Sequence, residues 1–481
     1  MRVRSLVLLG VLLTLTAAAA AQQHRESVTV EVIDVPVYVT RGTTPVAGLT
    51  RDDFELYVNG RRQPIEYFDT TAADGTPSMR ERRLFLLLFD LAFSHPHAIV
   101  RAQRAAAAAI EQGGPRDYFA VATYSSRRGI WFAVPFTRDH AALTRAVANL
   151  SHSASGDPLS LVLTNAERAS ELPMAEDAMR DIARERNIRV AQDQVLDLGD
   201  LAERLGPLDG EKHVVLMSEG YDGRAMHRFD VRSVSLSGRG RESGEPMLGA
   251  FGGRSFDQTL VNEITRMHQV FQRENVLLHA IDLEGVTATM AANDALNFLV
   301  KETGGQFIFA QNDVGTALSH LSGRLASGYR LGFRPANARS GYNTVTVKIR
   351  NARGARVNHR QGFFGTPRRG NTHDGVYLAD ILLNDVPQTG TAAALSLRDG
   401  VLTATIPMRE LAAQLPASAH AELLLYAFDA TGGALLYHRH VVRITDAAEE
   451  RVQVTVPEGT RVAKALLRVD GMLGFSRVGG E

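Results

Sequence analysis

The stretch Leu84-Phe-Leu-Leu-Leu-Phe-Asp90 determines which fold this chain adopts. An unbroken apolar run closed by one carboxylate is typical of a strand covered on both faces of a parallel sheet. Helical and extended patterns then alternate: helices are predicted at 98–111, 143–150, 175–205, 257–273, 292–302 and 314–326, and strands at 118–124, 130–136, 213–217, 276–281 and 306–309. This alternation predicts a doubly wound α/β domain over residues 83–328.

Short β patterns flank that domain on both sides. Residues 24–70 are predicted to be a small β module, because residues 27–39 alternate apolar and polar side chains and Asn59-Gly60, the strongest short-range hairpin signal, follows. Further strands are predicted at 329–333, 344–349 and 357–364. Because each set is too small to fold alone, we expect 24–70 to pair with the returning segment 329–365. The two would form one composite β domain into which the α/β domain is inserted.

The C-terminal part, residues 375–481, is predicted to be a β-sandwich. It follows a linker at 366–372 and contains short alternating segments separated by turns. Strands are predicted at 376–383, 393–397, 401–406, 421–428, 438–444, 451–456 and 463–469.

The first 21 residues have the pattern of a secretory signal peptide. Arg2 and Arg4 precede the apolar run Leu6–Leu15, and Ala19-Ala20-Ala21 supplies an A-x-A cleavage site. A retained anchor is the alternative, but a bilayer span needs about 20 predominantly apolar residues. We therefore expect residues 1–21 to be removed and the mature chain to be exported to the periplasm or cell exterior, with no membrane span left.

Composition excludes several classes of function. The 53 basic and 53 acidic side chains cancel, so no bulk attraction to nucleic acid or an anionic membrane is expected. The absence of cysteine excludes disulfides, thiolate metal sites and a cysteine nucleophile. The G-x-S-x-G, H-E-x-x-H and Walker motifs are also missing. Any metal must bind oxygen or imidazole, and no catalytic residue is assigned.

Residues that follow strands are the candidates for a binding site, because ligands of doubly wound sheets bind outside the carboxyl ends of the strands. Asp90 and Ser94 follow the first strand, Asp157 lies between helical segments, and Glu219 follows the strand at 213–217. Ser94, directly before His95-Pro96, has an alternative role as a helix N-cap.

This arrangement resembles the von Willebrand factor A domain, whose metal-ion-dependent adhesion site contains Asp-x-Ser-x-Ser, a threonine and a second aspartate. Asp90 and Ser94 match the first aspartate and the second serine, whereas Ala92 replaces the first serine. Asp157 stands roughly where the threonine would be, and Glu219 replaces the later aspartate. The resemblance implies that Mg²⁺ or Ca²⁺ binds at Asp90, Ser94 and Glu219, with Asp157 as an optional ligand.

The flanking segments resemble a narrower group, the exported VWFA-related proteins of the acidobacterial type. The matching patterns are Val35-Pro-Val-Tyr-Val39, Gly48-Leu-Thr-Arg-Asp-Asp-Phe-Glu-Leu56, Gly328-Tyr-Arg-Leu-Gly-Phe-Arg-Pro335 and Arg360-Gln-Gly-Phe-Phe364. This resemblance implies an exported chain whose A domain lies between β segments, without an established biochemical activity.

We therefore expect a non-enzymatic binding or adhesion module that recognises a protein or another macromolecule at the strand ends. The Gly/Arg-rich segment 221–256 is expected nearby, as a mobile or binding loop. Two alternatives stay open: an extracellular metal-assisted hydrolase that uses Asp90 and Glu219 as acid and base, and a metal-free structural scaffold. The oligomeric state is open as well.

Overall fold

The computed structural model describes residues 32–42, 44–70, 81–150, 173–220, 227–229, 254–256, 258–284, 290–308, 314–318, 321, 328–335, 341–350, 354–364, 370–416 and 418–479. The expected signal peptide, Asp157 and most of the segment 221–256 lie outside the described residues.

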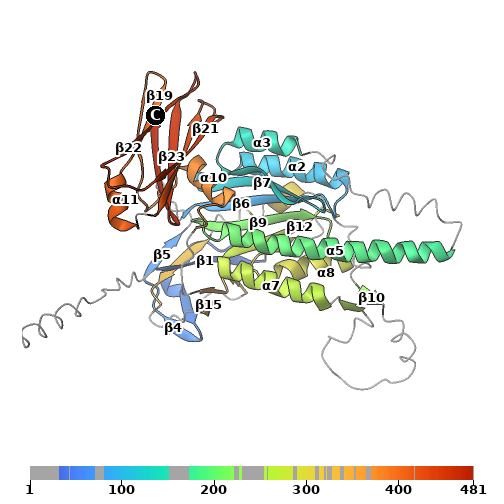
Figure 1. Cartoon of the computed structure of the whole chain (residues 1–481). Helices are drawn as coiled ribbons and strands as arrows, with labels where there is room; N and C mark the ends of the chain where they lie inside the picture. The colour runs from blue at the N-terminus through green and yellow to red at the C-terminus, as the bar shows by residue number, and fades with distance from the viewer. Residues whose placement is uncertain are drawn as a thin grey trace, which may run out of the picture.

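A mixed sheet forms the centre of the molecule (Figure 1). Its strands, in spatial order, are β13 (Phe307–Ile308), β12 (Val276–Asp282), β9 (Glu211–Ser218), β6 (Arg83–Asp90), β7 (Asp117–Ser125) and β8 (Gly129–Thr137). All neighbours are parallel except the hairpin of β7 and β8. Every residue of β6 is buried, as its continuous apolar run predicts, and every residue of β9 is buried as well, including Glu211, Lys212 and His213.

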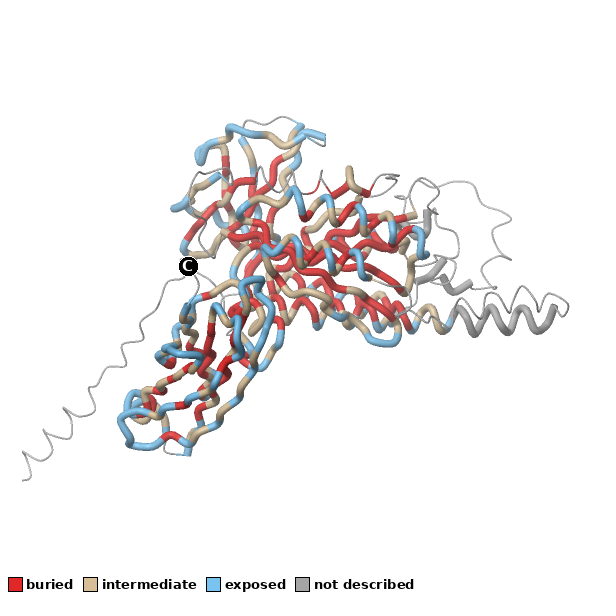
Figure 2. The backbone as a smooth tube through the Cα atoms, turned by 90° about the horizontal axis from the view of Figure 1, so that it is seen from above, coloured by how far each residue is buried: buried red, intermediate tan, exposed pale blue. Residues whose placement is uncertain are grey.

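Helices cover both faces of this sheet, and two apolar cores result. One core joins the sheet to α5 (Pro173–Leu205), α7 (Gln258–Glu274) and α8 (Met290–Val300). The other joins it to α2 (Pro96–Glu111), α3 (His140–Ala148) and the helical residues 314–318. Figure 2 shows the buried residues concentrated along the strands between these layers. The domain is therefore a doubly wound, three-layer α/β unit.

The direction of strand order reverses between β6 and β9. From β6 the chain proceeds outward to β7 and β8 on one side, and afterwards to β9, β12 and β13 on the other. The register places Asp90 beside Tyr124, and Ser218 beside Asp282, at the same edge of the sheet. This edge is the topological switch point, where open α/β sheets form binding crevices.

The two flanking β segments lie side by side in two sheets that enclose one core. The elements before the α/β domain are β1 (Ile33–Arg41), β2 (Thr44–Pro45), the 3₁₀ turn Arg51–Asp53, β3 (Phe54–Val58), β4 (Arg61–Gln63) and β5 (Tyr67–Thr70). Those after it are β14 (Tyr329–Phe333), β15 (Tyr342–Ile349), β16 (Arg356–His359) and β17 (Gly362–Phe364).

Antiparallel pairing joins these two sets. β1 lies between β14 and β16, and β3 pairs with β15. Alternate residues of β1 and β3, such as Val37 and Leu56, meet Leu331 and Val347 in the shared core. The composite β domain therefore contains strands from both ends of the insertion. The prediction of one strand at 357–364 is wrong, because β16 and β17 belong to different sheets.

The C-terminal part has two antiparallel sheets around a shared core. One contains β18 (Ala394–Arg398), β19 (Val401–Ile406) and β22 (Glu450–Thr455). The other contains β20 (His420–Phe428), β21 (Ala434–Arg443), β23 (Val462–Val469) and β24 (Met472–Gly479). A short helix, α11 (Met408–Gln414), joins the sheets.

The predicted strand at 376–383 is wrong. This segment is a helix, α10 (Gly375–Asn384), and Asp374 caps it by accepting hydrogen bonds from the backbone N–H groups of Val376 and Tyr377. The helix packs between the C-terminal sheets and the α/β domain, since Val376 joins the core of α5 whereas Ile381 packs on Leu424 and Leu466.

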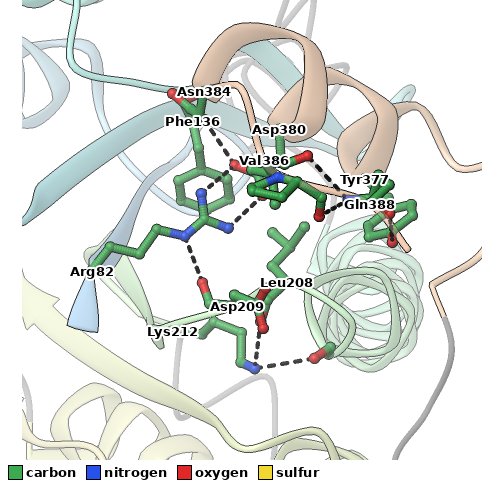
Figure 3. A network of polar contacts seen from close by, with 12 residues as sticks. Arg82, Phe136, Leu208, Asp209, Lys212, Tyr377, Asp380, Asn384, Val386 and Gln388 are labelled. Carbon is green, nitrogen blue, oxygen red and sulfur yellow. Dashed lines mark hydrogen bonds and ion pairs between the residues drawn. The ribbon is translucent and has the colours of Figure 1, made fainter. Parts of the chain in front are cut away.

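A buried polar network holds α10 against the α/β domain (Figure 3). The Arg82 guanidinium donates to both carboxylate oxygens of Asp380 at 2.8 and 2.5 Å and to the carbonyl of Asp209 at 2.7 Å. Asn384 donates to Asp380 and to the carbonyl of Phe136. Arg82 and Asp380 are almost completely buried, so the network is part of the interior rather than of the surface.

Both β domains lie at the end of the α/β domain opposite the switch-point edge (Figures 1 and 2). Near that edge a short antiparallel ribbon, β10 (His227–Phe229) with β11 (Arg254–Phe256), is the described part of the segment 221–256. Within the part of the chain that the structure describes, no helix combines the length and the hydropathy that a membrane span requires.

Candidate functional site

Asp90 is the centre of the switch-point edge and is completely buried. Its Oδ1 accepts hydrogen bonds from the backbone N–H groups of Ala92 at 3.0 Å and Phe93 at 3.1 Å. Its Oδ2 accepts from the Ser218 hydroxyl at 2.7 Å and from the Gln194 amide at 3.0 Å. Burial raises the pKa of the Asp90 carboxyl, although these donors favour its charged form.

Ser94 does not cap the helix that follows it, so that alternative role is wrong. The N-cap of α2 is His95, and it has no capping side-chain hydrogen bond. The Ser94 hydroxyl instead accepts a hydrogen bond from the backbone N–H of Glu219 at 3.1 Å. Ser94 therefore links the loop after β6 to the loop after β9.

Glu219 supplies the acceptor that the first turn of α2 lacks. Its Oε2 accepts from the backbone N–H of His95 at 2.7 Å and contacts the His95 ring Nδ1 at 2.7 Å. A carboxylate at a helix N-terminus also interacts favourably with the helix dipole. The Glu219 side chain is only 11% exposed, whereas the His95 side chain is 75% exposed. The Glu219 carboxylate is therefore mostly buried and bonded to His95, whereas the His95 imidazole faces solvent.

The exposed charged side chains at the start of α2 and on the hairpin between β7 and β8 are basic, and the exposed Asp193 of α5 lies near Tyr124 at the same edge. His97 is exposed beside His95, with their ring centroids 5.6 Å apart. The hairpin between β7 and β8 presents Arg127 and Arg128, and the Arg128 guanidinium lies 4.2 Å from the ring centroid of Trp131. Trp131, which is 42% exposed, is the single tryptophan of the chain.

The described residues at Asp90 do not fit a bound cation as they stand. A carboxylate oxygen has two lone pairs, and each Asp90 oxygen already accepts two hydrogen bonds. Among the residues that the structure describes, no three His, Asp or Glu side chains form a group able to hold a metal ion. Because Asp157 is outside the described residues, Mg²⁺ or Ca²⁺ at Asp90, Ser94, Asp157 and Glu219 stays a prediction.

Two residues of this centre, Ser218 and Gln194, were not predicted from the sequence. Ser218 directly precedes Glu219 in the strand-end segment, and its hydroxyl also accepts a hydrogen bond from the backbone N–H of Gly220 at 2.9 Å. Gln194 interrupts the apolar stripe of α5 between Ala191 and Leu198, and it is 1% exposed. A polar residue on a buried helical stripe needs a hydrogen-bond partner, and this need was the sequence signal that could have identified Gln194.

No protein-family model and no curated protein matches this sequence. Among solved structures, the chain is similar to a von Willebrand factor type A protein from Catenulispora acidiphila, with 12% identity, a TM-score of 0.31, and coverage of 70% of this chain and 77% of that one. It is also similar to the vWF domain of the type V pili tip protein Mfa5 from Porphyromonas gingivalis, with 12% identity, a TM-score of 0.26, and coverage of 51% and 95%.

A third similar structure is an aerotolerance-related membrane protein from Bacteroides fragilis, with 11% identity, a TM-score of 0.28, and coverage of 50% of this chain and 98% of that one. Because all three TM-scores are this low, we infer the function of the chain from the geometry of its strand ends and not from these likenesses.

Proposed function

We propose that this chain is an exported, non-enzymatic binding module, resembling a von Willebrand factor A domain, which recognises a protein or another macromolecule at its strand-end face. We define this face by His95, His97, Arg127, Arg128 and Trp131. One observation carries the proposal: exposed basic and aromatic side chains lie at the carboxyl-end edge of the sheet, at the start of α2 and on the hairpin between β7 and β8, and Glu219 and Ser94 tie the segment before α2 to the loop after β9 by hydrogen bonds.

The strand-end face is free of the other two domains. Both β domains are attached at the opposite end of the sheet (Figure 1). Tyr38 of β1 contacts Glu211 at the amino end of β9, and Asp380 of α10 contacts Arg82 directly before β6. A macromolecule can therefore approach the carboxyl ends of the strands without displacing either β domain.

Helix α5 enlarges the surface beside this face. Its 33 residues correspond to a length of about 50 Å, whereas the eight residues of β9 span only about 26 Å. Gln194 contacts Asp90 at the edge of the sheet, so the N-terminal part of α5 runs past that edge (Figure 1). A projecting helix of this kind suits a large partner better than a small molecule.

The hydrolase alternative is less well supported. A general acid or base must come within hydrogen-bond reach of substrate, but Asp90 is completely buried and already accepts four hydrogen bonds. Glu219 is bound to His95. The structure also has a cleft of about 420 Å³, but it belongs to the composite β domain, where it is lined by residues including Arg62 and Arg350.

Charge reversal at the strand-end face tests the proposed function. We expect Arg127→Glu with Arg128→Glu to weaken partner capture by about tenfold or more, since both side chains are exposed and charge at an interface controls encounter and specificity. The mature chain, residues 22–481, would be used to capture proteins from the exported fraction of the cells that make it, followed by titration of the captured partner.

The control is Arg398→Glu, which reverses one exposed charge at the last residue of β18, in the C-terminal domain. It should leave capture unchanged. Equal losses in both variants would show a nonspecific effect of charge, and no loss in the hairpin variant would place the binding surface elsewhere.

A further inference from the structure

The hydrogen bonds of Asp90 connect three elements that are far apart in the sequence. Its Oδ1 binds the turn that leads from β6 to α2, and its Oδ2 binds α5 through Gln194 and the end of β9 through Ser218. A divalent cation at a strand-end aspartate would connect loops in the same way, by binding oxygens from each of them. In this chain the connection is already made by donors that belong to the protein.

The donors on Oδ2 also occupy the approach to the carboxylate. The Ser218 hydroxyl oxygen lies 2.7 Å from Oδ2 and the Gln194 amide nitrogen lies 3.0 Å from it, and each points a hydrogen at Oδ2. A cation at the same oxygen would have to displace the Gln194 amide or the Ser218 hydroxyl and would meet their hydrogens instead of lone pairs. Gln194 is the stronger argument of the two, because it lies on helix α5 and not in the loop that follows β6 or β9.

We propose that the Gln194 amide, with the Ser218 hydroxyl, takes the place of a cation at Asp90 and holds the strand-end face in its binding conformation without metal. Gln194 and Ser218 are thus positioning residues. The inference rests on the proposed function only where it says that the strand-end face binds a partner. That Gln194 and Ser218 replace a cation is argued from the contacts of Asp90 alone.

The same contacts continue from Asp90 to the surface. Ser218 accepts from the backbone N–H of Gly220 and so fixes the loop that carries Glu219. Glu219 then bonds to Ser94 through its backbone and to His95 through its carboxylate. Direct hydrogen bonds therefore connect Gln194 with the exposed His95. We expect loss of the Gln194 contact to change the position of His95.

The test converts the amide into a carboxylate. Gln194→Glu places a second buried carboxylate about 3 Å from Asp90, and two carboxylates at this distance favour a shared proton or a bound cation. Thermal unfolding of the mature chain would be recorded with EDTA and with millimolar Mg²⁺, Ca²⁺ or Mn²⁺. We expect the wild type to be unaffected and Gln194→Glu to gain at least about 2 °C with one of these cations.

Three further variants complete the test. Gln112→Glu adds the same charge at an exposed position after α2 and should not respond to cations. Asp90→Asn should fold and stay insensitive to cations, because Gln194 can reverse its amide and the Ser218 hydroxyl can rotate, so that both accept from the new side-chain NH₂. Gln194→Ala removes the amide without adding a charge; if Gln194→Glu fails to fold, this variant replaces it and should gain a cation response.

A wild type that loses stability in EDTA or gains it with a cation would overturn the inference, and so would Gln194→Glu and Gln194→Ala variants that both fold and both ignore every cation. These readouts need no partner. Failure to capture a partner would therefore count against the proposed function alone.

Discussion

Arg82→Ala is expected to destabilise the chain by about 3–5 kcal/mol, because it leaves the Asp380 carboxylate buried without its charge partner. The two side chains are 1% and 2% exposed, and both oxygens of the carboxylate bind the guanidinium. Urea unfolding measures this loss of stability. Circular dichroism monitors unfolding of the whole chain, and the fluorescence of Trp131 monitors unfolding of the α/β domain. Since the pair joins α10 to that domain, the two signals should also separate.

Two controls distinguish a buried pair from an ordinary charge effect. Arg451→Ala breaks the exposed pair with Glu449, whose side chains are 67% and 43% exposed, and should cost less than about 1 kcal/mol. Arg82→Met combined with Asp380→Leu removes both charges and should recover most of the lost stability. A loss for Arg82→Ala no larger than that for Arg451→Ala would mean that the Arg82–Asp380 pair does not hold α10 to the α/β domain.

The α/β domain was predictable because its central strands are buried on both faces. β6 is apolar from Leu84 to Phe89, β9 is apolar from Val214 to Met217, and β12 is apolar except for His279 and Asp282. The strand-end rule then identified Asp90 and Glu219 as residues of one edge, which the parallel register brings about directly. Prediction from sequence was strongest for the central strands, because burial on both faces determines both that these segments are strands and that they lie in the middle of the sheet.

The segment that became α10 was misread because a short apolar run does not distinguish a strand from a helix. Asp374 favours the helix, because its side chain caps the N-terminus of α10. Burial of the Asp380 side chain could not be predicted, because its partner Arg82 precedes it by nearly 300 residues. The break between β16 and β17 was hidden for a related reason. The segment Asn358-His-Arg-Gln-Gly362 has no apolar pattern that would mark where the chain passes from one sheet to the other.

The site was only partly predictable, because its polar contacts are tertiary. Ser94 precedes a proline and looks like an N-cap, but the Glu219 loop supplies the acceptor for α2, and Ser94 bonds to that loop instead. Gln194 is 104 residues from Asp90 in the sequence. Its only sequence signal is its place on the apolar stripe of α5, which predicts burial but not its partner.

Tyr38→Phe is expected to cost about 1–3 kcal/mol near neutral pH, and less in acid. Alternate residues of β1 face opposite sides, so Val37 and Val39 enter the core of the composite β domain while Tyr38 enters the α/β core beside Phe85. The Tyr38 hydroxyl donates to Glu211 at 2.5 Å, which is the polar contact that ties β1 to β9. Phenylalanine keeps the ring packing and removes only this hydrogen bond.

The pH dependence follows from the charge on Glu211. Burial raises the pKa of the Glu211 carboxyl, but His213, the Tyr38 hydroxyl and Arg330 stabilise the charged form more, so the pKa lies below its ordinary value of 4.5. A carboxyl whose pKa is lowered by folding contributes stability above about pH 4.5, and this contribution is lost as the pH falls through the lowered pKa. The bond from Tyr38 is strong only while Glu211 is charged.

The cost of Tyr38→Phe should therefore shrink as the pH falls below about 4.5, when thermal unfolding of wild type and variant is compared across the range. Tyr124→Phe is the matched control, because the buried Tyr124 hydroxyl donates at 3.0 Å to the backbone carbonyl of Val190, which does not titrate. Its cost should not depend on pH. If the two variants behave alike at every pH, the charge of Glu211 does not stabilise the contact between β1 and β9.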